Sequence, residues 1–258
     1  MKLVTFNIRY DCGKDGENNF EFRKEIILRK VRAEKPDVIC FQEVLTHMAA
    51  WLKESLPEYY VVGCPREQNL VGEGLYIAYR FDTMDLFRLE NFWLSPTPLI
   101  PATRYAEQSK CPRVCTEVVL QELSSCKCFR LLNVHLDHIS SLARVLGAQQ
   151  ILDKLESETF LPDIPAIVTG DFNATPDAPE IQLFKNTPYL RCLTDGIGDT
   201  YHGYSLAQPL EIDYIFAHPS ISCQKVEKWT DREGAVYLSD HYPVCAEFNL
   251  PDSKEYLA

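Results

Sequence analysis

Polar motifs beside apolar, strand-like runs constrain the fold of this chain more than any other feature. The most informative is Thr169-Gly170-Asp171-Phe172-Asn173, which follows the apolar run Ala166-Ile167-Val168. Residues two apart in a strand point to the same face, so Asp171 and Asn173 present an acid and an amide together. A single Gly-Asp-x-Asn is most often a turn, and the motif gains weight because similar motifs recur along the chain.

Other strand-like runs carry polar residues of the same chemical kind. They are Phe6-Asn7-Ile8, Phe41-Gln42-Glu43, Asn133-Val134-His135 and Ser239-Asp240-His241. Loops at the strand ends of α/β proteins gather ligands, so we expect these side chains to lie close together. Hard oxygen ligands with two imidazoles suit a Mg²⁺-type site that handles a phosphoryl group.

Length and composition set the frame. A chain of 258 residues with 46% hydrophobic content can bury a full core, and it has no linker-like or repetitive tract, so we expect a single domain over residues 1–258. We expect no membrane span, because no apolar run approaches the roughly 18 residues that cross a bilayer. The chain enters a strand at Lys2-Leu3-Val4 without a leader-like segment, which predicts a cytoplasmic protein. The net charge of -11 weighs against a long footprint on duplex DNA.

Ten cysteines raise the alternative of a zinc site or of disulfides. The runs 114–123 and 128–135 predict a hairpin that turns near Ser124-Ser125. In that hairpin Gln121 lies opposite Cys128, and Cys115 lies roughly 20 Å from Cys128 along the ladder. A site that joins these two thiols is therefore disfavoured, and we interpret the cysteines as small hydrophobic residues of a reduced protein.

The hydrophobic periodicity predicts alternating helices and strands. Helices are expected over 21–34, from a cap at Thr46, over 140–158 and over 179–185. Strands are expected between them, with a strand-rich middle from Tyr59 to His135 and strands again near 212–217, 223–229 and 244–248. This order predicts helices that cover two packed sheets.

With these motifs the chain resembles the endonuclease/exonuclease/phosphatase superfamily, which includes deoxyribonuclease I, sphingomyelinases, inositol polyphosphate 5-phosphatases and deadenylases. The resemblance runs from about Leu3 to Phe248 and keeps the motifs in order. It implies an α/β fold of the deoxyribonuclease I type: a four-layer α/β sandwich, with two packed mixed β-sheets flanked by helices. It also implies an enzyme, a hydrolase of phosphoester bonds with Mg²⁺ as cofactor and Mn²⁺ as the alternative ion.

The resemblance also implies roles for residues of the motifs. Asn7 and Glu43 resemble the metal-binding pair, and Asp240 of the closing Ser-Asp-His joins them as a metal residue. Asp171 and Asn173 resemble the pair near the attacking water and the phosphate oxygens. A bound cation would polarise the phosphoryl oxygen while Asp171 aligns or deprotonates the water.

The histidines complete the implied catalytic set. Asp213 in Ile-Asp-Tyr-Ile-Phe resembles the acid that orients His241, and this pairing is expected to keep His241 cationic. His135 resembles the second phosphate-facing histidine. It is expected to donate a hydrogen bond to the phosphate from the side opposite His241. Glu73, between two glycines, is its expected carboxylate partner.

Substrate contacts are expected from residues in the loops. Arg113 resembles an anion-binding arginine, and His138 and His202 are expected in the pocket, with Arg104 in a loop that walls it. The lysine that follows the Gln-Glu motif in abasic-site nucleases is replaced by Val44, which argues against a DNA-repair role.

Together these features predict a monomeric phosphodiesterase or phosphatase with a compact phosphoester substrate. A nuclease that acts on DNA or RNA is the alternative within the enzyme class, so nucleic acid stays a second expected partner. A non-catalytic module that binds a phospho-ligand is the alternative of another class. The enzyme is favoured because the metal and general-base residues of the motifs are all present.

Overall fold

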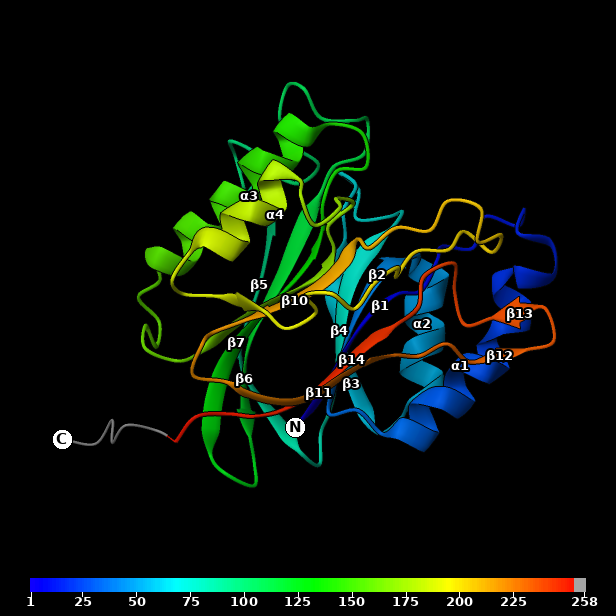
Figure 1. Ribbon diagram of the computed structural model, residues 1–258, viewed down its shortest axis with the longest axis horizontal. Helices are drawn as coiled ribbons and strands as arrows, with labels where there is room; N and C mark the ends of the chain where they lie inside the picture. The colour runs from blue at the N-terminus through cyan, green and yellow to red at the C-terminus, as the bar shows by residue number, and fades with distance from the viewer. Residues whose placement is uncertain (253–258) are drawn as a thin grey trace.

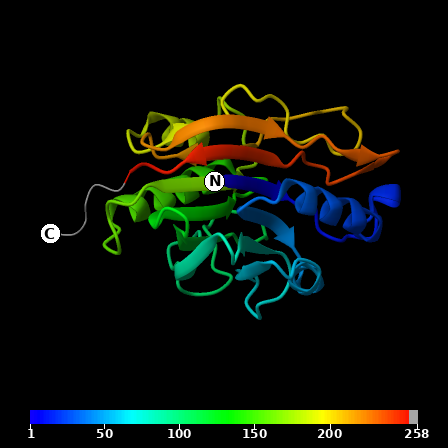
Figure 2. The ribbon, with the colours of Figure 1, turned by 90° about the horizontal axis from the view of Figure 1, so that it is seen from below.

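Two mixed β-sheets pack face to face in the computed structural model, which describes residues 1–252 (Figures 1 and 2). The first sheet contains, in spatial order, β11 (Ser222–Lys228), β14 (Val244–Asn249), β1 (Lys2–Asn7), β2 (Val38–Val44), β4 (Gly74–Arg80) and β3 (Tyr59–Pro65). The second contains β5 (Met84–Trp93), β6 (Val114–Glu122), β7 (Lys127–His135), β8 (Ala166–Asp171), β10 (Asp213–Ala217) and β9 (Arg191–Cys192). A separate small hairpin pairs β12 (Arg232–Glu233) with β13 (Val236–Tyr237).

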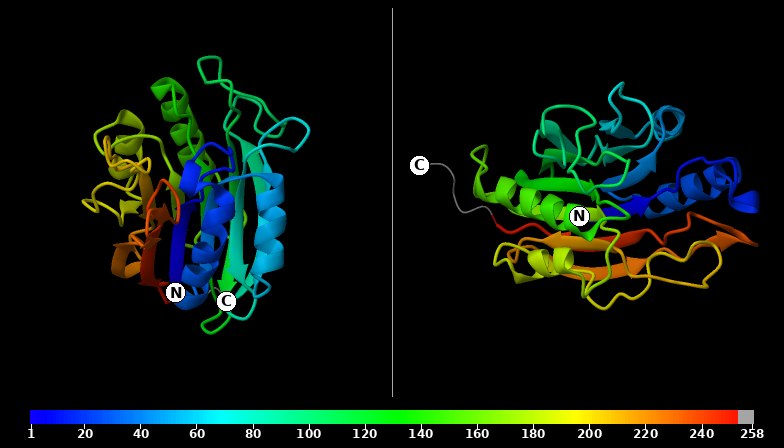
Figure 3. Two further views of the ribbon diagram at one scale, coloured as in Figure 1. Left: turned by 90° about the vertical axis from the view of Figure 1, so that its right-hand side faces the viewer. Right: turned by 90° about the horizontal axis from the view of Figure 1, so that it is seen from above.

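Helices cover the outer face of each sheet. The first sheet is covered by α1 (Phe20–Glu34) and α2 (Thr46–Ser55), and the second by α3 (Ser141–Glu156) and α4 (Pro179–Asn186). A short 3-10 helix, η1 (Gly16–Asn18), precedes α1. Figure 1 shows α3 and α4 on the opposite side of the molecule from α1 and α2, and Figure 3 shows the same arrangement from two further sides. Apolar side chains such as Cys40, Ile77, Leu131 and Ile167 fill the layer between the sheets, so the predicted four-layer α/β sandwich is confirmed.

The structure corrects details of the predicted elements. Helix α2 begins at Thr46 itself, and Leu45 occupies the position before the first turn, so the expected Thr46 cap is wrong. The predicted β6–β7 hairpin is confirmed, with Gln121 opposite Cys128. All ten cysteines, which lie within the described residues, are free thiols. The two-residue strands β9, β12 and β13 were too short to leave a periodic signal. Within residues 1–252 the helices are too short or too polar to cross a bilayer.

Parallel strand pairs at the centre of each sheet gather the polar motifs. In the first sheet β1 runs parallel to β2, and in the second β7 runs parallel to β8. Parallel neighbours end at the same edge of a sheet, so Asn7 and Glu43 emerge together from one sheet, and His135 and Asp171 from the other. In the second pair His135 and Asp171 are direct register partners.

Two buried amides fasten the sheets to each other beside these ends. Gln42 Nε2 donates to Asn133 Oδ1 at 2.8 Å, and Asn133 Nδ2 donates to the carbonyl oxygens of Phe41 at 2.9 Å and Tyr76 at 3.1 Å. Both amide side chains are fully buried, where an unmade hydrogen bond is costly. Because Gln42 precedes Glu43 by one residue, these bonds fix the distance between the two halves of the site.

Gly170 lets β8 approach β7 closely enough to align Asp171 with His135. Its φ is +144°, and a Cβ atom at this position would lie 1.9 Å from the carbonyl oxygen of Val134. Only glycine combines this backbone conformation with such a close approach.

Gly170→Ala is therefore expected to destabilise the protein by about 1–3 kcal/mol from backbone strain alone, with the clash in addition. Urea unfolding followed by circular dichroism measures the change. Gly234→Ala is the matched control, because Gly234 also has a positive φ, of +60°, but has open space around the added carbon. Equal loss of stability in the two variants would show that the contact with Val134 has no importance.

Candidate active site

A cleft of about 530 Å³ opens where the central strands of both sheets end. Most of the predicted site residues line it: Glu43, Glu73, Arg113, His135, His138, Asp171, Asn173, Asp240 and His241. Asn7 and Asp213 are buried behind its wall and contact residues in it. The structure thus brings together motifs that are spread over more than 230 positions of the sequence.

Glu43 enters the cleft from an irregularity in β2. The register between β2 and β4 shifts between Phe41 and Val44, and Glu43 has a φ of +63°. Such a bulge redirects a side chain, and a positive φ is uncommon for a residue other than glycine. The Glu43 carboxylate accepts hydrogen bonds from Asn7 Nδ2 at 3.1 Å and from the Tyr10 backbone N–H at 3.0 Å.

Asp171 lies at the centre of the hydrogen-bond network. Its Oδ2 accepts from Asn7 Nδ2 at 2.9 Å and lies 3.4 Å from His135 Nε2, while its Oδ1 accepts from the Asn173 N–H at 2.8 Å. Burial raises the pKa of Asp171 to about 7, although the nearby charge of His241 opposes the shift. A carboxyl group with such a pKa can take up and release a proton near neutral pH.

His241 is held as a cation by carboxylates. Its Nδ1 lies 2.8 Å from Asp213 Oδ2, which agrees with the expected pairing, and its Nε2 lies 3.9 Å from Asp171 Oδ2. Burial lowers the pKa of His241, but the charges of Asp213, Asp171 and Asp240 outweigh burial and raise it to about 10. The imidazolium can therefore donate to a phosphoryl oxygen throughout the neutral range.

His135 differs from His241 in charge. Burial lowers its pKa well below the ordinary value, and the neighbouring guanidinium groups of Arg113 and Arg66 lower it further. The structure therefore gives His135 a neutral ring, which can still donate one hydrogen bond, so its expected contact with a phosphate oxygen stays a prediction.

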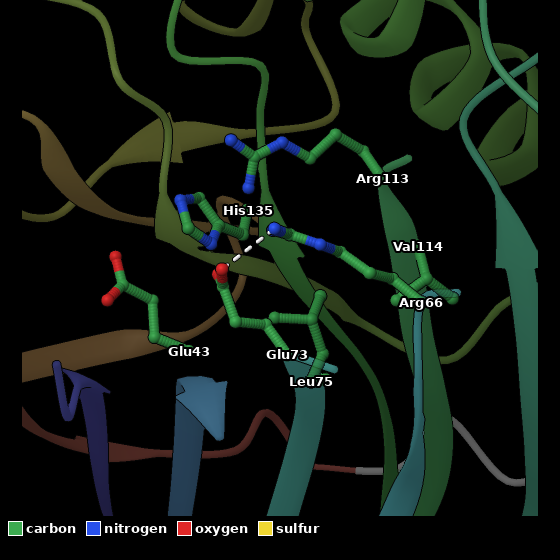
Figure 4. A pocket seen from close by; sticks show the side chains of 8 residues that line it. Glu43, Arg66, Glu73, Leu75, Arg113, Val114 and His135 are labelled. Atoms are coloured by element: carbon green, nitrogen blue, oxygen red, sulfur yellow. Dashed lines mark hydrogen bonds and ion pairs between the residues drawn. The ribbon is translucent and has the colours of Figure 1, made fainter. Parts of the chain in front are cut away.

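Glu73 does not pair with His135 as predicted. Its Oε1 accepts from Arg66 Nη2 at 2.8 Å, as Figure 4 shows, while the ring of His135 lies beside Asp171. The guanidinium is a stronger partner for a carboxylate than a neutral imidazole, so Arg66 takes Glu73. Sequence reasoning missed Arg66, because it follows β3 in a loop without a periodic pattern.

Arg113 and His138 meet at one end of the cleft. Arg113 Nη2 donates to His138 Nδ1 at 3.0 Å, and both side chains line the cleft. Burial lowers the pKa of His138, and the charge of Arg113 lowers it further, so the neutral ring accepts this hydrogen bond. Their contact with substrate stays a prediction.

Two predicted pocket residues lie elsewhere. His202 is buried between the rings of Tyr237 and Tyr242, at centroid distances of 4.6 Å and 4.3 Å, and its Nδ1 accepts from the Tyr204 N–H. Its role is loop packing, so its prediction as a pocket residue is wrong. Arg104 is also wrong as a wall of the pocket, because its guanidinium donates to the Ser109 carbonyl within its own loop.

Arg9 and Tyr201 line the cleft although sequence reasoning did not select them. The guanidinium of Arg9 pairs with Asp15 and lies 3.7 Å from Asp240 Oδ2, and its backbone N–H donates to Asn7 Oδ1. Tyr201 packs edge-on against the ring of His241. Arg9 lies beyond the end of β1 and has a φ of +58°, so strand alternation does not continue to it and gave no signal in the sequence.

The donor set beside Glu43 fits a hard divalent cation. Glu43 and Asp240 supply carboxylate oxygens, and burial raises the pKa of Asp240, with the negative charge of Glu43 raising it further. The two carboxylates line the same cleft and offer the oxygen ligands that Mg²⁺ or Mn²⁺ prefers. A second candidate ligand group consists of Glu43, Glu73 and His135, with one ligand atom from each within 4.8 Å of the others. In the structure the carboxylate of Glu73 is already paired with Arg66. Asn7 directs its nitrogen to the carboxylates, so it would bind a cation only after its amide turns over.

Comparison with known proteins agrees with this geometry. The model of the endonuclease/exonuclease/phosphatase family matches residues 4–241, so the chain belongs to this family, whose members hydrolyse phosphoesters. The chain is similar to an endonuclease/exonuclease/phosphatase from Bacteroides vulgatus, with 28% identity, 96% and 98% coverage of the two chains and a TM-score of 0.90. It is also similar to a mannosyl-6-phosphatase from Bacteroides thetaiotaomicron, with 26% identity, 97% and 100% coverage and a TM-score of 0.88. An uncharacterised protein of Acanthamoeba polyphaga mimivirus is 28% identical over 96% of this chain and 100% of its own.

Proposed function

We propose that this protein is a Mg²⁺- or Mn²⁺-dependent hydrolase of compact phosphoesters. The observation that carries the proposal is the position of Asp171, a buried acid with a pKa of about 7. Its Oδ2 lies 3.9 Å from His241 Nε2 and shares the donor Asn7 Nδ2 with Glu43, in a cleft that Asp240 also lines. This arrangement provides a base, a cationic hydrogen-bond donor and a cation site in one cleft. The likeness to a mannosyl-6-phosphatase supports a small phosphorylated substrate such as a sugar phosphate.

Glu43 and Asp240, with Asn7 after rotation of its amide, would hold the cation. When bound, the cation supplies polarisation of a phosphoryl oxygen. Asp171 accepts the proton of the attacking water, because its carboxylate lies at the centre of the network and its pKa lies near neutral pH.

The phosphoryl oxygens are met by donors on two elements. Asn173 Nδ2 gives one hydrogen to the Leu136 carbonyl and has a second for the substrate. His241 donates through Nε2, since its Nδ1 is bound to Asp213. Charge that develops on the phosphoryl group in the transition state strengthens both contacts.

A nuclease remains the alternative within this family. The net charge of -11 disfavours it, because a protein that grips many phosphates needs matching positive charge. A non-catalytic binding module is disfavoured because the base, the donors and the cation ligands all converge in the cleft. The monomeric state and the cytoplasmic location stay predictions.

Hydrolysis is expected to require Mg²⁺ or Mn²⁺ and to favour sugar phosphates over nucleic acid. Assays with sugar phosphates, phosphoinositides, sphingomyelin, RNA and duplex DNA, each across a salt series, measure the preference. A chelator should abolish turnover, and Glu43→Gln should raise the cation concentration for half-maximal rate by about tenfold or more, since it removes a charged ligand.

Glu54→Gln, the same change on the exposed end of α2, is the matched control for Glu43→Gln. Full activity in saturating chelator would remove metal dependence from the proposal. Cleavage of duplex DNA with a steep salt dependence, together with no turnover of the compact substrates, would make the nuclease the better assignment.

A further inference from the structure

Arg23 is a fully buried arginine in the first turn of α1, with 0% of its surface exposed. Charged side chains are almost never fully buried unless an opposite charge or a set of hydrogen bonds compensates them. In the described part of the chain, every hydrogen-bond acceptor of this guanidinium is a main-chain carbonyl oxygen. The side chain therefore acts as a link between segments of the backbone.

Four hydrogen bonds connect Arg23 to three segments of the chain. Its Nε donates to the Asn18 carbonyl at 2.8 Å, and its Nη2 donates to the Arg9 carbonyl at 2.9 Å. Its Nη1 donates to the carbonyl oxygens of Ile8 and, at 3.0 Å, of Leu238. The guanidinium is planar and its donors have fixed directions, so these bonds fix the positions of the three segments relative to one another.

Two of these segments carry proposed ligands of the cation. Ile8 directly follows Asn7 at the end of β1, and Leu238 comes two residues before Asp240. The ladder between β1 and β14 ends at Thr5, before the chain reaches either ligand. Contacts beyond the ladder must therefore hold the Asp240 segment beside the end of β1.

Glu43, by contrast, is placed by the sheet itself. Strands β1 and β2 pair in register as far as Asn7 opposite Gln42, the residue before Glu43. The main-chain ladder therefore fixes the Glu43 side of the cation site, whereas the bonds of Arg23 fix its Asp240 side.

We propose that Arg23 is a positioning residue of the cation site: it holds the segment that carries Asp240 against the end of β1 and thereby sets the affinity for the divalent cation. It acts through main-chain carbonyl groups and does not line the cleft, so it is not a catalytic residue. This inference rests on the proposed function, because it takes Glu43 and Asp240 as the cation ligands.

Binding of Mn²⁺ without substrate tests the proposal, and electron paramagnetic resonance measures the free and bound cation. Arg23→Lys should raise the Kd for Mn²⁺ about tenfold or more, as the loss of a group that orients metal ligands does. The lysine ammonium keeps the charge, but its single nitrogen cannot reach all three segments. Arg23→Met, which removes every donor, should raise the Kd further.

Arg130 provides the matched control, because it is also a buried arginine, with 3% of its surface exposed. Its guanidinium pairs with the carboxylates of Glu117 and Glu158, and it does not line the cleft. Arg130→Lys should lower the free energy of unfolding, measured with urea, and leave the Kd for Mn²⁺ within about twofold, since distant sites act independently. Equal increases of the Kd in the Arg23 and Arg130 variants would show that Arg23 acts through global stability alone and would overturn the proposal.

Ser239 keeps the proposal testable if the variants of Arg23 do not fold. Its Oγ donates to the Asn7 carbonyl at 2.7 Å, which is a second link between the same two segments. Ser239→Ala should therefore also raise the Kd for Mn²⁺, by about threefold to tenfold for the loss of one hydrogen bond. An unchanged Kd would show that the spacing of these segments does not determine the affinity.

Kinetics with Mg²⁺ separate weak cation binding from damage to the reacting groups. In Arg23→Lys the Mg²⁺ concentration for half-maximal rate should rise about tenfold, whereas kcat at saturating Mg²⁺ should recover. A kcat that stays low at saturating Mg²⁺, together with unchanged Mn²⁺ binding, would contradict the positioning role.

The two proposals fail in different ways. If the wild-type protein hydrolyses phosphoesters with Mg²⁺, but neither Arg23→Lys nor Ser239→Ala changes the Kd for Mn²⁺, the positioning role is refuted and the hydrolase stands. If Mn²⁺ binding depends on Arg23 but no phosphoester is hydrolysed with any divalent cation, the positioning role stands and the hydrolase is refuted.

Discussion

Asp171→Asn is expected to lower kcat by a factor of about 10² to 10⁴, the usual contribution of a general base. The amide has nearly the shape of the carboxyl group and can still accept from Asn7 and the Asn173 N–H, so the fold should persist. What is lost is the ability to take a proton from water. Steady-state kinetics with a sugar phosphate and Mg²⁺ measure the change.

The pH dependence of kcat/KM distinguishes two roles for Asp171, that of a general base and that of a purely structural acid. In the wild-type enzyme kcat/KM should rise with pH up to about 7, because burial raises the pKa of Asp171 and only its ionised form accepts a proton. A cation held beside it favours the ionised form and moves this limb to lower pH. The limb should vanish in Asp171→Asn and persist in the control Asp177→Asn, an exposed acid on the loop that follows β8. An unchanged kcat in Asp171→Asn would remove the residue from the mechanism.

The convergence of the candidate catalytic residues could be predicted from the sequence because strand geometry determines their position. Glu43, His135 and Asp171 each follow an apolar run. Such a run forms a strand that ends at a sheet edge, and this position does not depend on the conformation of the loops. The residues behind the wall were predictable for the same reason: Asp213 begins β10, which is paired with β8 so that Asp213 lies opposite Asp171.

The substrate end could not be predicted in this way. Arg66 and Glu73 lie on the loop between β3 and β4, and their contact depends on the path of that loop and leaves no periodic pattern. Two groups could have paired with the carboxylate of Glu73: the ring of His135, as the sequence predicted, or the guanidinium of Arg66. The guanidinium is the stronger partner and forms the pair.

His202 shows the opposite error. A histidine beside tyrosines in a loop resembles a pocket residue, but aromatic rings bury well against each other. Tyr237 and Tyr242, which are 35 and 40 positions further along the chain, close over His202 and remove it from the cleft. Only the tertiary structure brings these rings together.

His241→Ala is expected to lower kcat/KM by a factor of about 10² to 10³, as the loss of one preorganised donor to a transition-state oxygen does. The imidazolium is buried and is held by Asp213 at 2.8 Å, so its charge acts on the phosphoryl group with little screening by water. His218→Ala is the matched control, because His218 is outside the cleft and bonds to Ser220.

Asp213→Asn tests whether the charge of His241, and not only its shape, matters. Burial lowers the pKa of His241, and Asp213 is the main carboxylate that raises it to about 10. Without that charge the folded-state pKa must fall, so the proton leaves at lower pH and the alkaline limb of kcat/KM should move from near pH 10 toward neutral pH. The rate below the new limb should recover, since the ring keeps its position. An alkaline limb that stays in place in Asp213→Asn, or near-normal turnover in His241→Ala, would return His241 to a purely structural role.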